Sequence, residues 1–314
     1  MLEPSPTQSQ QPPVSQADRS AAIDRLRRTL AAAANGSGGW GYYPGKASRI
    51  EPTCWSLLSL AATADEPRDA LAVVNPHLQF LARSQRPDGL LQDLPSLPNL
   101  TFNGLAAVAC LHVGGGTAEA ILTRLVPALL RVKGVSVENK ARASDALQGW
   151  PWIEGTFSWV EPTAFCLLAL KHERRRHPSA AADARIREAE QVLLTRSCVT
   201  GGWNYGNASV LDQDLRPYVS TTALGLLALQ DRRANPVVVR GLEFLQRSQT
   251  KEPSGMALAL TALCLRIHGL PCEQVELALV DDVARVNRLN NLNIVAMVLY
   301  ALSGEGHGAA AFTV

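Results

Sequence analysis

Two kinds of predicted helix alternate along this chain, and their alternation limits the fold more than any other feature does. Segments such as LQFLARSQ at 78–85 and LEFLQRSQ at 242–249 carry apolar residues at helical spacing and polar residues on the other side. Segments such as TAFCLLAL and MALALTALCL are apolar nearly all round. A helix of the first kind has one buried face, whereas a helix of the second kind is buried on every side. The pattern therefore predicts inner helices that are ringed by outer helices.

The predicted fold class is all-α, with about six inner and about six outer helices in a single domain at 18–303. We expect outer helices near 18–34, 70–84, 117–132, 180–198, 236–249 and 272–286. We expect inner helices near 52–63, 101–113, 161–172, 219–231, 254–268 and 290–302. Glycine-containing stops follow three outer helices, at Gly89, at Gly201 and Gly202, and at Gly255. Residues 1–17, rich in Pro, Ser and Gln, are predicted to be a disordered tail, and 304–314 a C-terminal tail.

The tripeptide Glu-Pro-Thr occurs twice, starting at Glu51 and at Glu161, each time before a compact apolar run. Proline is well tolerated in the first turn of a helix, where its missing N–H costs nothing. Threonine there can satisfy a free donor, and glutamate suits the positive end of the helix dipole. We interpret both tripeptides as starts of inner helices, and the alternative, that either glutamate is a functional acid, stays open.

Two longer stretches resemble a known family. They are GGWGYYPGKASRIEPTCWSLLSL and GGWNYGNASVLDQDLRPYVSTTALGLLAL. Both look like repeats of squalene/terpenoid cyclases and of the β-subunits of protein prenyltransferases, and the resemblance covers roughly residues 20–303. It implies an α/α toroid in which the inner helices surround a central, often apolar cavity. It also implies that the reactive end lies where loops enter the N-termini of the inner helices.

The family's chemical motifs are only partly present. Protonation-initiated cyclases carry Asp-x-Asp-Asp before an inner helix, and the nearest match here is Asp212-Gln213-Asp214-Leu215, without the fourth aspartate. The resemblance therefore implies Asp214 as the candidate acid, beside Asp212, with Glu161 and Glu51 as alternatives. Prenyltransferases hold zinc with an Asp-x-Cys element, and no such element occurs in this chain. We therefore predict no metal and no cofactor.

Aromatic residues are concentrated in the loops that lead into the predicted inner helices. An aromatic rim over an apolar pocket suits an isoprenoid-like ligand, because aromatic faces can stabilise carbocations. The alternative for Trp40 and Trp203 is packing between successive repeats. Arg216 is similar to a basic residue at the rim of prenyltransferase pockets. The candidate binding residues are Trp40, Tyr42, Trp152, Trp159, Trp203, Arg216 and Tyr218.

The net charge of +2 argues against a nucleic-acid partner. No apolar run approaches the ~18 residues of a transmembrane span, which leaves peripheral membrane contact open. The N-terminus lacks a signal-peptide pattern and the cysteines lack a disulfide framework, so we expect a cytoplasmic protein. The need for a second subunit also stays open.

Three function classes remain. The first is an isoprenoid-handling enzyme that resembles a terpenoid cyclase or prenyltransferase, with acid-initiated cyclisation in an apolar cavity. The second is a non-catalytic toroid that binds an apolar ligand or a partner protein. The third, ranked lower, is a carbohydrate-active helical barrel, which would need a clear pair of acids in the cavity. Asp281 and Asp282 are adjacent in the sequence, and adjacent residues seldom act as an opposed acid/base pair.

Overall fold

The computed structural model describes residues 14–64, 66–93, 97–136, 146–303 and 310–314, which include twelve α-helices. The outer helices are α1 (Gln16–Ala33), α3 (Pro67–Arg83), α5 (Gly115–Arg131), α7 (Ala180–Thr195), α9 (Pro236–Ser248) and α11 (Glu273–Leu289). The inner helices are α2 (Ile50–Ala62), α4 (Leu100–Val113), α6 (Val160–Arg176), α8 (Val219–Ala228), α10 (Gly255–His268) and α12 (Leu292–Leu302). Short elements are β1 (Ser209–Val210), β2 (Gln213–Asp214), and the 3-10 turns η2 (Gln230–Arg232) and η3 (Ala310–Phe312).

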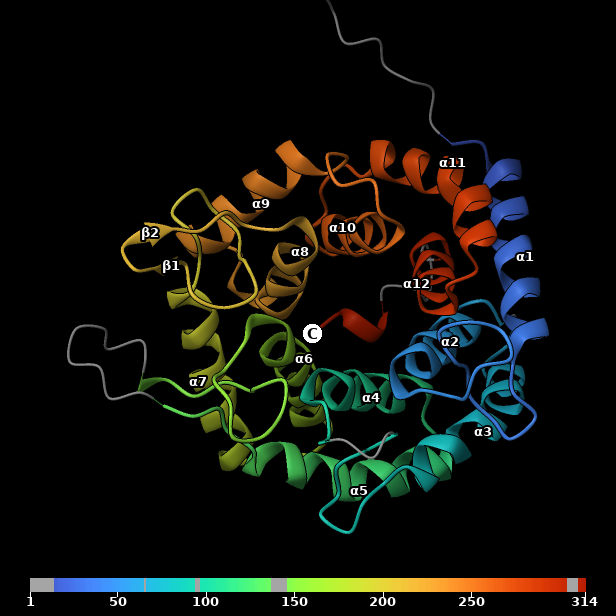
Figure 1. Cartoon of the computed structure of the whole chain (residues 1–314), viewed down its shortest axis with the longest axis horizontal. Coiled ribbons are helices and arrows are strands. Elements are labelled where there is room, and N and C mark those ends of the chain that lie inside the picture. Colours follow the sequence, from blue (N-terminus) through green and yellow to red (C-terminus); the bar gives the residue numbers. More distant parts are fainter. Residues whose placement is uncertain (1–13, 65, 94–96, 137–145, 304–309) are drawn as a thin grey trace, which may run out of the picture.

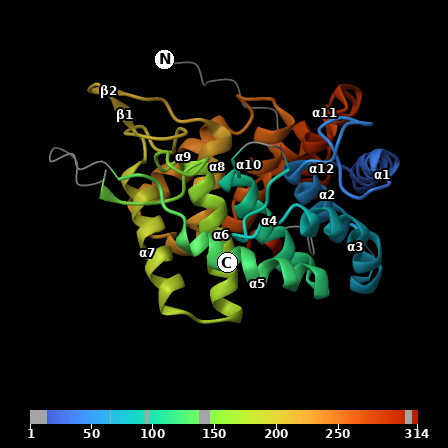
Figure 2. The ribbon, with the colours of Figure 1, turned by 60° about the horizontal axis from the view of Figure 1, so that its bottom comes forward.

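The six inner helices form a closed ring (Figure 1). Each inner helix packs on the next in chain order, and α12 packs on α2 to close the circle. The outer helices surround this ring, as Figure 2 shows from a tilted view. The predicted all-α class, with inner helices ringed by outer ones, is confirmed. No helix in the described ranges is both long and apolar enough to cross a membrane.

One predicted glycine stop has a different place in the structure. Helix α9 ends at Ser248, and Gly255 instead begins α10, whose cap is Ser254. A Cβ on Gly255 would lie 2.6 Å from Cγ2 of Ile294, so the glycine permits close packing of α10 against α12. Its physical role is thus a helix contact and not the end of an outer helix.

Three of the loops that enter inner helices share one hydrogen-bond pattern. In each loop the backbone N–H of a tryptophan donates to the threonine hydroxyl at the fourth position of the inner helix. The indole N–H of the same tryptophan donates to a carbonyl of the preceding outer helix. The sets of tryptophan, threonine and carbonyl residue are Trp40, Thr53 and Leu30; Trp150, Thr163 and Leu129; and Trp203, Thr222 and Leu193. In the loop before α4, Leu91 and Asn103 take the places of the tryptophan and the threonine.

This pattern explains the threonine of each Glu-Pro-Thr. Both tripeptides lie in the first turn of an inner helix. The hydroxyls of Thr53 and Thr163 satisfy a donor in the preceding loop and not a free N–H of their own helix. They therefore tie each loop to its inner helix.

The structure describes only part of the two predicted tails. Residues 1–13 of the predicted N-terminal tail and 304–309 of the predicted C-terminal tail lie outside the described residues. Helix α1 begins at Gln16. Residues 310–314 lie within the ring of inner helices, with Phe312 fully buried (Figure 1).

Candidate functional site

Four inner helices bring their second residues together at one end of the ring. Glu51, Thr101 and Glu161 begin α2, α4 and α6 in this way and line the same pocket. Asn293, the second residue of α12, donates from Nδ2 to Oε1 of Glu51 at 3.1 Å. The N-terminal ends of these four inner helices thus form the floor of a mouth, which is where the family resemblance placed the reactive end.

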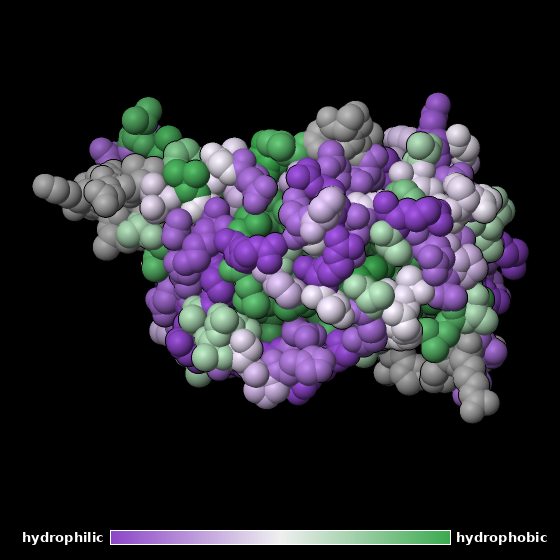
Figure 3. Space-filling view, turned by 90° about the horizontal axis from the view of Figure 1, so that it is seen from below, coloured by the Kyte–Doolittle hydropathy of each residue, from purple (hydrophilic) through white to green (hydrophobic). Residues whose placement is uncertain are grey.

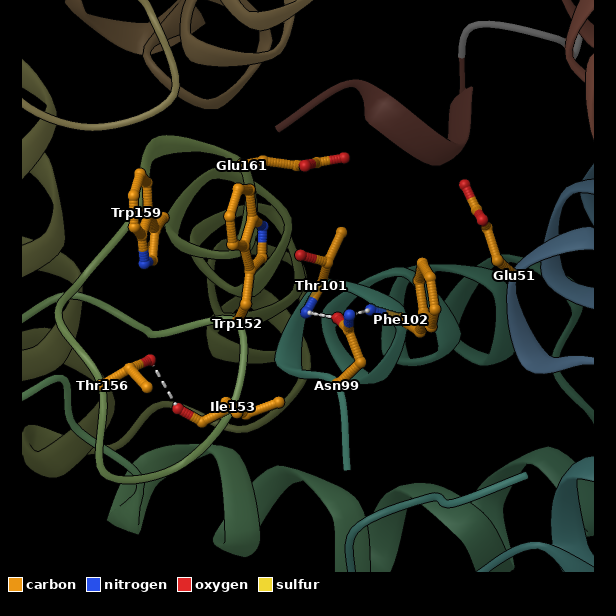
Figure 4. Close-up of a pocket in the computed structure, with 9 residues that line it drawn as sticks. All are labelled: Glu51, Asn99, Thr101, Phe102, Trp152, Ile153, Thr156, Trp159 and Glu161. Atoms are coloured by element: carbon orange, nitrogen blue, oxygen red, sulfur yellow. Dashed lines mark hydrogen bonds between the residues drawn. The ribbon is translucent and has the colours of Figure 1, made fainter. Parts of the chain in front are cut away.

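The pocket at this mouth has a volume of about 610 Å³ and is open to solvent. Its walls combine two carboxyl groups, an amide and hydroxyls with aromatic rings. Figure 4 shows the carboxyl groups of Glu51 and Glu161 directed into one space from opposite sides. The lining residues are Glu51, Asn99, Thr101, Phe102, Trp152, Ile153, Thr156, Trp159 and Glu161. A few polar groups among aromatic walls are typical of small-molecule sites of this size.

Glu51 is held by donors on two sides. The Tyr42 hydroxyl donates to its Oε2 at 2.5 Å, and the Asn293 amide donates to its Oε1. Burial raises the pKa of Glu51, while these two hydrogen bonds act in the opposite direction by stabilising the ionised form. Both carboxylate oxygens of Glu51 thus accept hydrogen bonds from side chains, and the carboxyl group does not cap its helix. These two hydrogen bonds stabilise its ionised form.

Glu161 has one side-chain hydrogen-bond donor where Glu51 has two. Burial, and then the negative charge of Glu51, raise the pKa of Glu161 from 4.5 to about 7, while a hydrogen bond from Trp152 opposes the shift. The two glutamates sit in corresponding places of the repeat, since Tyr42 and Trp152 each follow the core tryptophan of their loop by two residues. Each aromatic partner hydrogen-bonds the glutamate of its own repeat.

The raised pKa of Glu161 predicts a loss of stability as pH rises. Between 4.5 and about 7 the folded chain keeps a proton that the unfolded chain releases, so the free energy of unfolding falls across that window and levels off above it. The shift corresponds to roughly 3 kcal/mol. Glu161→Gln should remove this decline and make the variant more stable than the parent at pH 8. Urea unfolding at pH 5 and pH 8 measures it, and an unchanged difference between the two pH values would contradict the burial of this carboxyl group.

Two stacked indoles form one wall of the pocket. The rings of Trp152 and Trp159 lie 4.5 Å apart at 8°. The aromatic series continues to Tyr205, 6.3 Å from Trp152, and then to Tyr218, 4.9 Å further. Figure 3 shows hydrophobic side chains at the upper left of the molecule and in a second patch further along the upper edge, with hydrophilic residues between them. The mouth is therefore rimmed by flat apolar surfaces above a polar floor.

Two buried polar atoms at the floor have no hydrogen-bond partner within the described residues. They are Oγ1 of Thr101 and Oδ1 of Asn293, on side chains that are 4% and 5% exposed. A buried polar atom without a partner costs free energy, so such atoms commonly mark where a ligand or water binds. Both atoms belong to residues next to Glu51 in the ring.

Other predicted site residues lie elsewhere. Trp40 and Trp203 are buried in the core, where their indoles join loop to outer helix, so they pack between repeats and do not line the pocket. Asp212 is in the turn between β1 and β2 with a positive φ, and Asp214 pairs with Ser209 across that hairpin. Arg216 follows the hairpin. All three side chains of this charged group are exposed and are absent from the pocket lining.

Six residues of the site were not predicted: Asn99, Thr101, Phe102, Ile153, Thr156 and Asn293. A signal for two of them was present in the sequence. Once Glu51 and Glu161 are taken as second residues of inner helices, the same position in other repeats gives Thr101 and Asn293. Within the described ranges no group of three His, Cys, Asp or Glu side chains is placed to hold a metal ion.

No protein-family model matches the sequence, and no curated protein matches it significantly. Solved structures do match it. A GH76 α-mannanase from Bacteroides thetaiotaomicron has a TM-score of 0.65 at 9% identity and covers 91% of this chain and 95% of its own. The type II terpene cyclase MstE from Scytonema, solved with geranylgeranyl dihydroxybenzoate, has a TM-score of 0.57 at 16% identity, with coverage of 94% and 98%. A β-1,3-1,4-glucanase from Paenibacillus has a TM-score of 0.59 at 12% identity, with coverage of 93% of each chain.

The chain is an α/α toroid. It shares the fold of the type II terpene cyclase MstE. It shares the same fold with enzymes that are named for action on glycans. Because one fold supports several chemistries, the choice among them depends on the mouth of this toroid.

Proposed function

We propose that this toroid is a carbohydrate-active enzyme that acts on a small saccharide at the mouth of the ring. The proposal is carried by one observation, the pair of carboxyl groups of Glu51 and Glu161 in a single pocket. The family resemblance named the two glutamates only as alternatives for a single acid, whereas both line one pocket and so supply the pair of acids that the carbohydrate hypothesis needs. Enzymes that cleave glycosidic bonds use two carboxyl groups that flank the bond.

The environments of the two glutamates suggest different roles. With a pKa of about 7, Glu161 is partly protonated at neutral pH and can act as the general acid toward a departing oxygen. Burial raises the pKa of Glu51, but hydrogen bonds from Tyr42 and Asn293 oppose that rise and hold its carboxyl group in place for the role of base or stabilising carboxylate. Separate tasks for two carboxyl groups in one site are a known outcome of such differences.

The other groups at the mouth also suit a saccharide. The stacked rings of Trp152 and Trp159 offer a flat apolar surface to the C–H face of a sugar ring. Thr101 lines the pocket, and its Oγ1, which has no hydrogen-bond partner among the described residues, is a candidate partner for a sugar hydroxyl group. By contrast, protonation of an alkene calls for a strong acid, and a carboxyl group with a pKa of about 7 is a weak one.

The test is a screen of the full chain against chromogenic glycosides and short oligosaccharides, with sugar products detected by mass spectrometry. Binding is followed in parallel by intrinsic fluorescence, because Trp152 and Trp159 lie in the pocket. We expect turnover of at least one saccharide. Absence of both turnover and binding across the panel would contradict the proposal.

The second candidate is isoprenoid chemistry, favoured by the aromatic rim. Trp152, Trp159, Tyr205 and Tyr218 form a series of rings that could cover an isoprenoid chain or face a carbocation. The similar cyclase binds a geranylgeranyl compound. Fluorescence titration with squalene, farnesyl diphosphate and geranylgeranyl diphosphate tests this candidate. Saturable quenching followed by a cyclised product would favour it over the saccharide.

A non-catalytic toroid predicts a third result. A saccharide or isoprenoid would then bind to the parent chain without turnover. Asp214→Asn should change neither binding nor turnover under the saccharide proposal, because Asp214 lies on the exposed hairpin. Loss of turnover in Asp214→Asn would instead support the acid role that the cyclase resemblance implied.

A further inference from the structure

Residues 310–314 occupy the centre of the ring, where three aromatic side chains of the inner helices and the segment meet. The ring of Phe312 stacks on Trp55 at 5.5 Å and 21°, and it meets Tyr300 edge-on at 5.7 Å. Phe312 is fully buried, and Ala311 is 2% exposed. This short segment is therefore packed as core.

Polar contacts fix the segment at the end of the ring opposite the mouth. The Gln230 amide donates to the carbonyl of Phe312 at 2.6 Å and accepts the Val314 N–H at 3.0 Å. Arg175 donates to the carbonyl of Thr313 at 3.3 Å. Gln230 follows the end of α8 and Arg175 lies in the last turn of α6, so the segment is held at the C-terminal ends of inner helices.

An aromatic layer separates this segment from the carboxyl groups. Trp55 lies four residues after Glu51 on α2, and Phe165 lies four residues after Glu161 on α6. Residues at this spacing share a face of a helix, one turn apart. The rings of Trp55 and Phe165 are in edge contact at 6.5 Å, and Phe312 stacks on Trp55. The axis of the ring is thus filled below the polar floor.

We infer that residues 310–314 are a plug that closes the axial cavity of the ring and thereby limits the depth of the mouth pocket. Ligands enter and leave on the mouth side only. A bound ligand reaches no deeper into the ring than the side chains of Trp55 and Phe165. The plug thus acts as a specificity determinant that excludes long apolar chains from the axis. The inference rests on the proposed function only in taking the mouth pocket as the place where the ligand binds. Closure of the axial cavity by residues 310–314 does not depend on the reaction at the mouth.

The first experiment replaces Phe312 by Ala in the full chain and uses benzene as the probe. Removal of the ring should leave an apolar cavity beside Trp55 and Tyr300, and dry apolar cavities of this kind bind benzene. We expect a lower melting temperature for the variant and a benzene-dependent rise that saturates. The parent chain and the control Phe157→Ala, whose side chain is 54% exposed in the loop before α6, should show no such rise.

Phe312→Leu provides a milder change should the alanine variant not fold, and its melting temperature should lie between those of Phe312→Ala and the parent. Hydrogen exchange of the unsubstituted chain gives an independent measurement. The Val314 amide, bonded to Gln230, should exchange slowly. Rapid exchange across 310–314, or a Phe312→Leu variant as stable as the parent, would overturn the plug. Neither result depends on a saccharide or on turnover, so failure of the plug is distinguishable from failure of the proposed function.

Discussion

Glu161→Gln is expected to lower kcat/KM for the saccharide substrate by about 10²–10⁴-fold, the contribution typical of a general acid. Glutamine keeps the shape of the side chain but has no proton to give to a leaving oxygen. For the parent enzyme, kcat/KM should fall as pH rises through about 7, because burial and the charge of Glu51 place the pKa of Glu161 there. A pH series of kcat/KM for the parent and the variant measures both effects.

Two further variants test whether the loss of activity is specific to Glu161. Glu154→Gln changes an exposed glutamate in the same loop and should leave kcat/KM unaltered. Glu51→Gln removes the negative charge that raises the pKa of Glu161, so its residual activity should decline at a lower pH than that of the parent. A Glu161→Gln enzyme with parental kcat/KM, or an alkaline limit that Glu51→Gln leaves in place, would refute the assignment of Glu161 as the acid.

Trp203→Ala is expected to destabilise the toroid by about 4 kcal/mol, within the range for truncation of a buried large aromatic side chain. The indole is fully buried and donates to the carbonyl of Leu193 at 2.7 Å. Two glycines leave room for it, since a Cβ on Gly225 of α8 or on Gly241 of α9 would lie 3.1 or 2.9 Å from its ring. Alanine would leave a cavity between an inner and an outer helix and would remove the hydrogen bond from the indole to the Leu193 carbonyl.

Urea unfolding followed by circular dichroism measures the effect. Trp159→Ala is the matched control, because this indole is only partly buried and lines the pocket. We expect it to cost less stability than Trp203→Ala while weakening ligand binding. Equal loss of stability in both variants would contradict the division between packing and binding tryptophans.

The architecture was predictable because it depends on local patterns. Apolar residues on one face or on all faces of a helix determine whether that helix is outer or inner, and this information lies within each segment. The same applies to the Glu-Pro-Thr tripeptides, which lie in the first turns of α2 and α6. The prediction that Gly255 follows the end of an outer helix was wrong. Gly255 begins α10 and lies close to Ile294 of α12, and this contact between separate helices could not be predicted from the local sequence.

The site was predictable only in part. The sequence placed Glu51, Glu161, Trp152 and Trp159 among its candidates, and the structure brings these four into one pocket. It gave the first place to Asp214 on the strength of a partial motif, whereas that side chain lies on an exposed hairpin. Trp40 and Trp203 share the composition of the pocket aromatics but point into the core.

By itself, the sequence determined that this chain forms a ring of inner helices within a ring of outer helices, because hydrophobic periodicity acts within single helices. Only the tertiary structure decided which side chains meet. Closure of the ring brings Asn293 to Glu51, places Glu161 in the same pocket and packs Phe312 against Trp55. The raised pKa of Glu161 follows from that closure, because desolvation and the charge of Glu51 act only after segments far apart in the chain have come together.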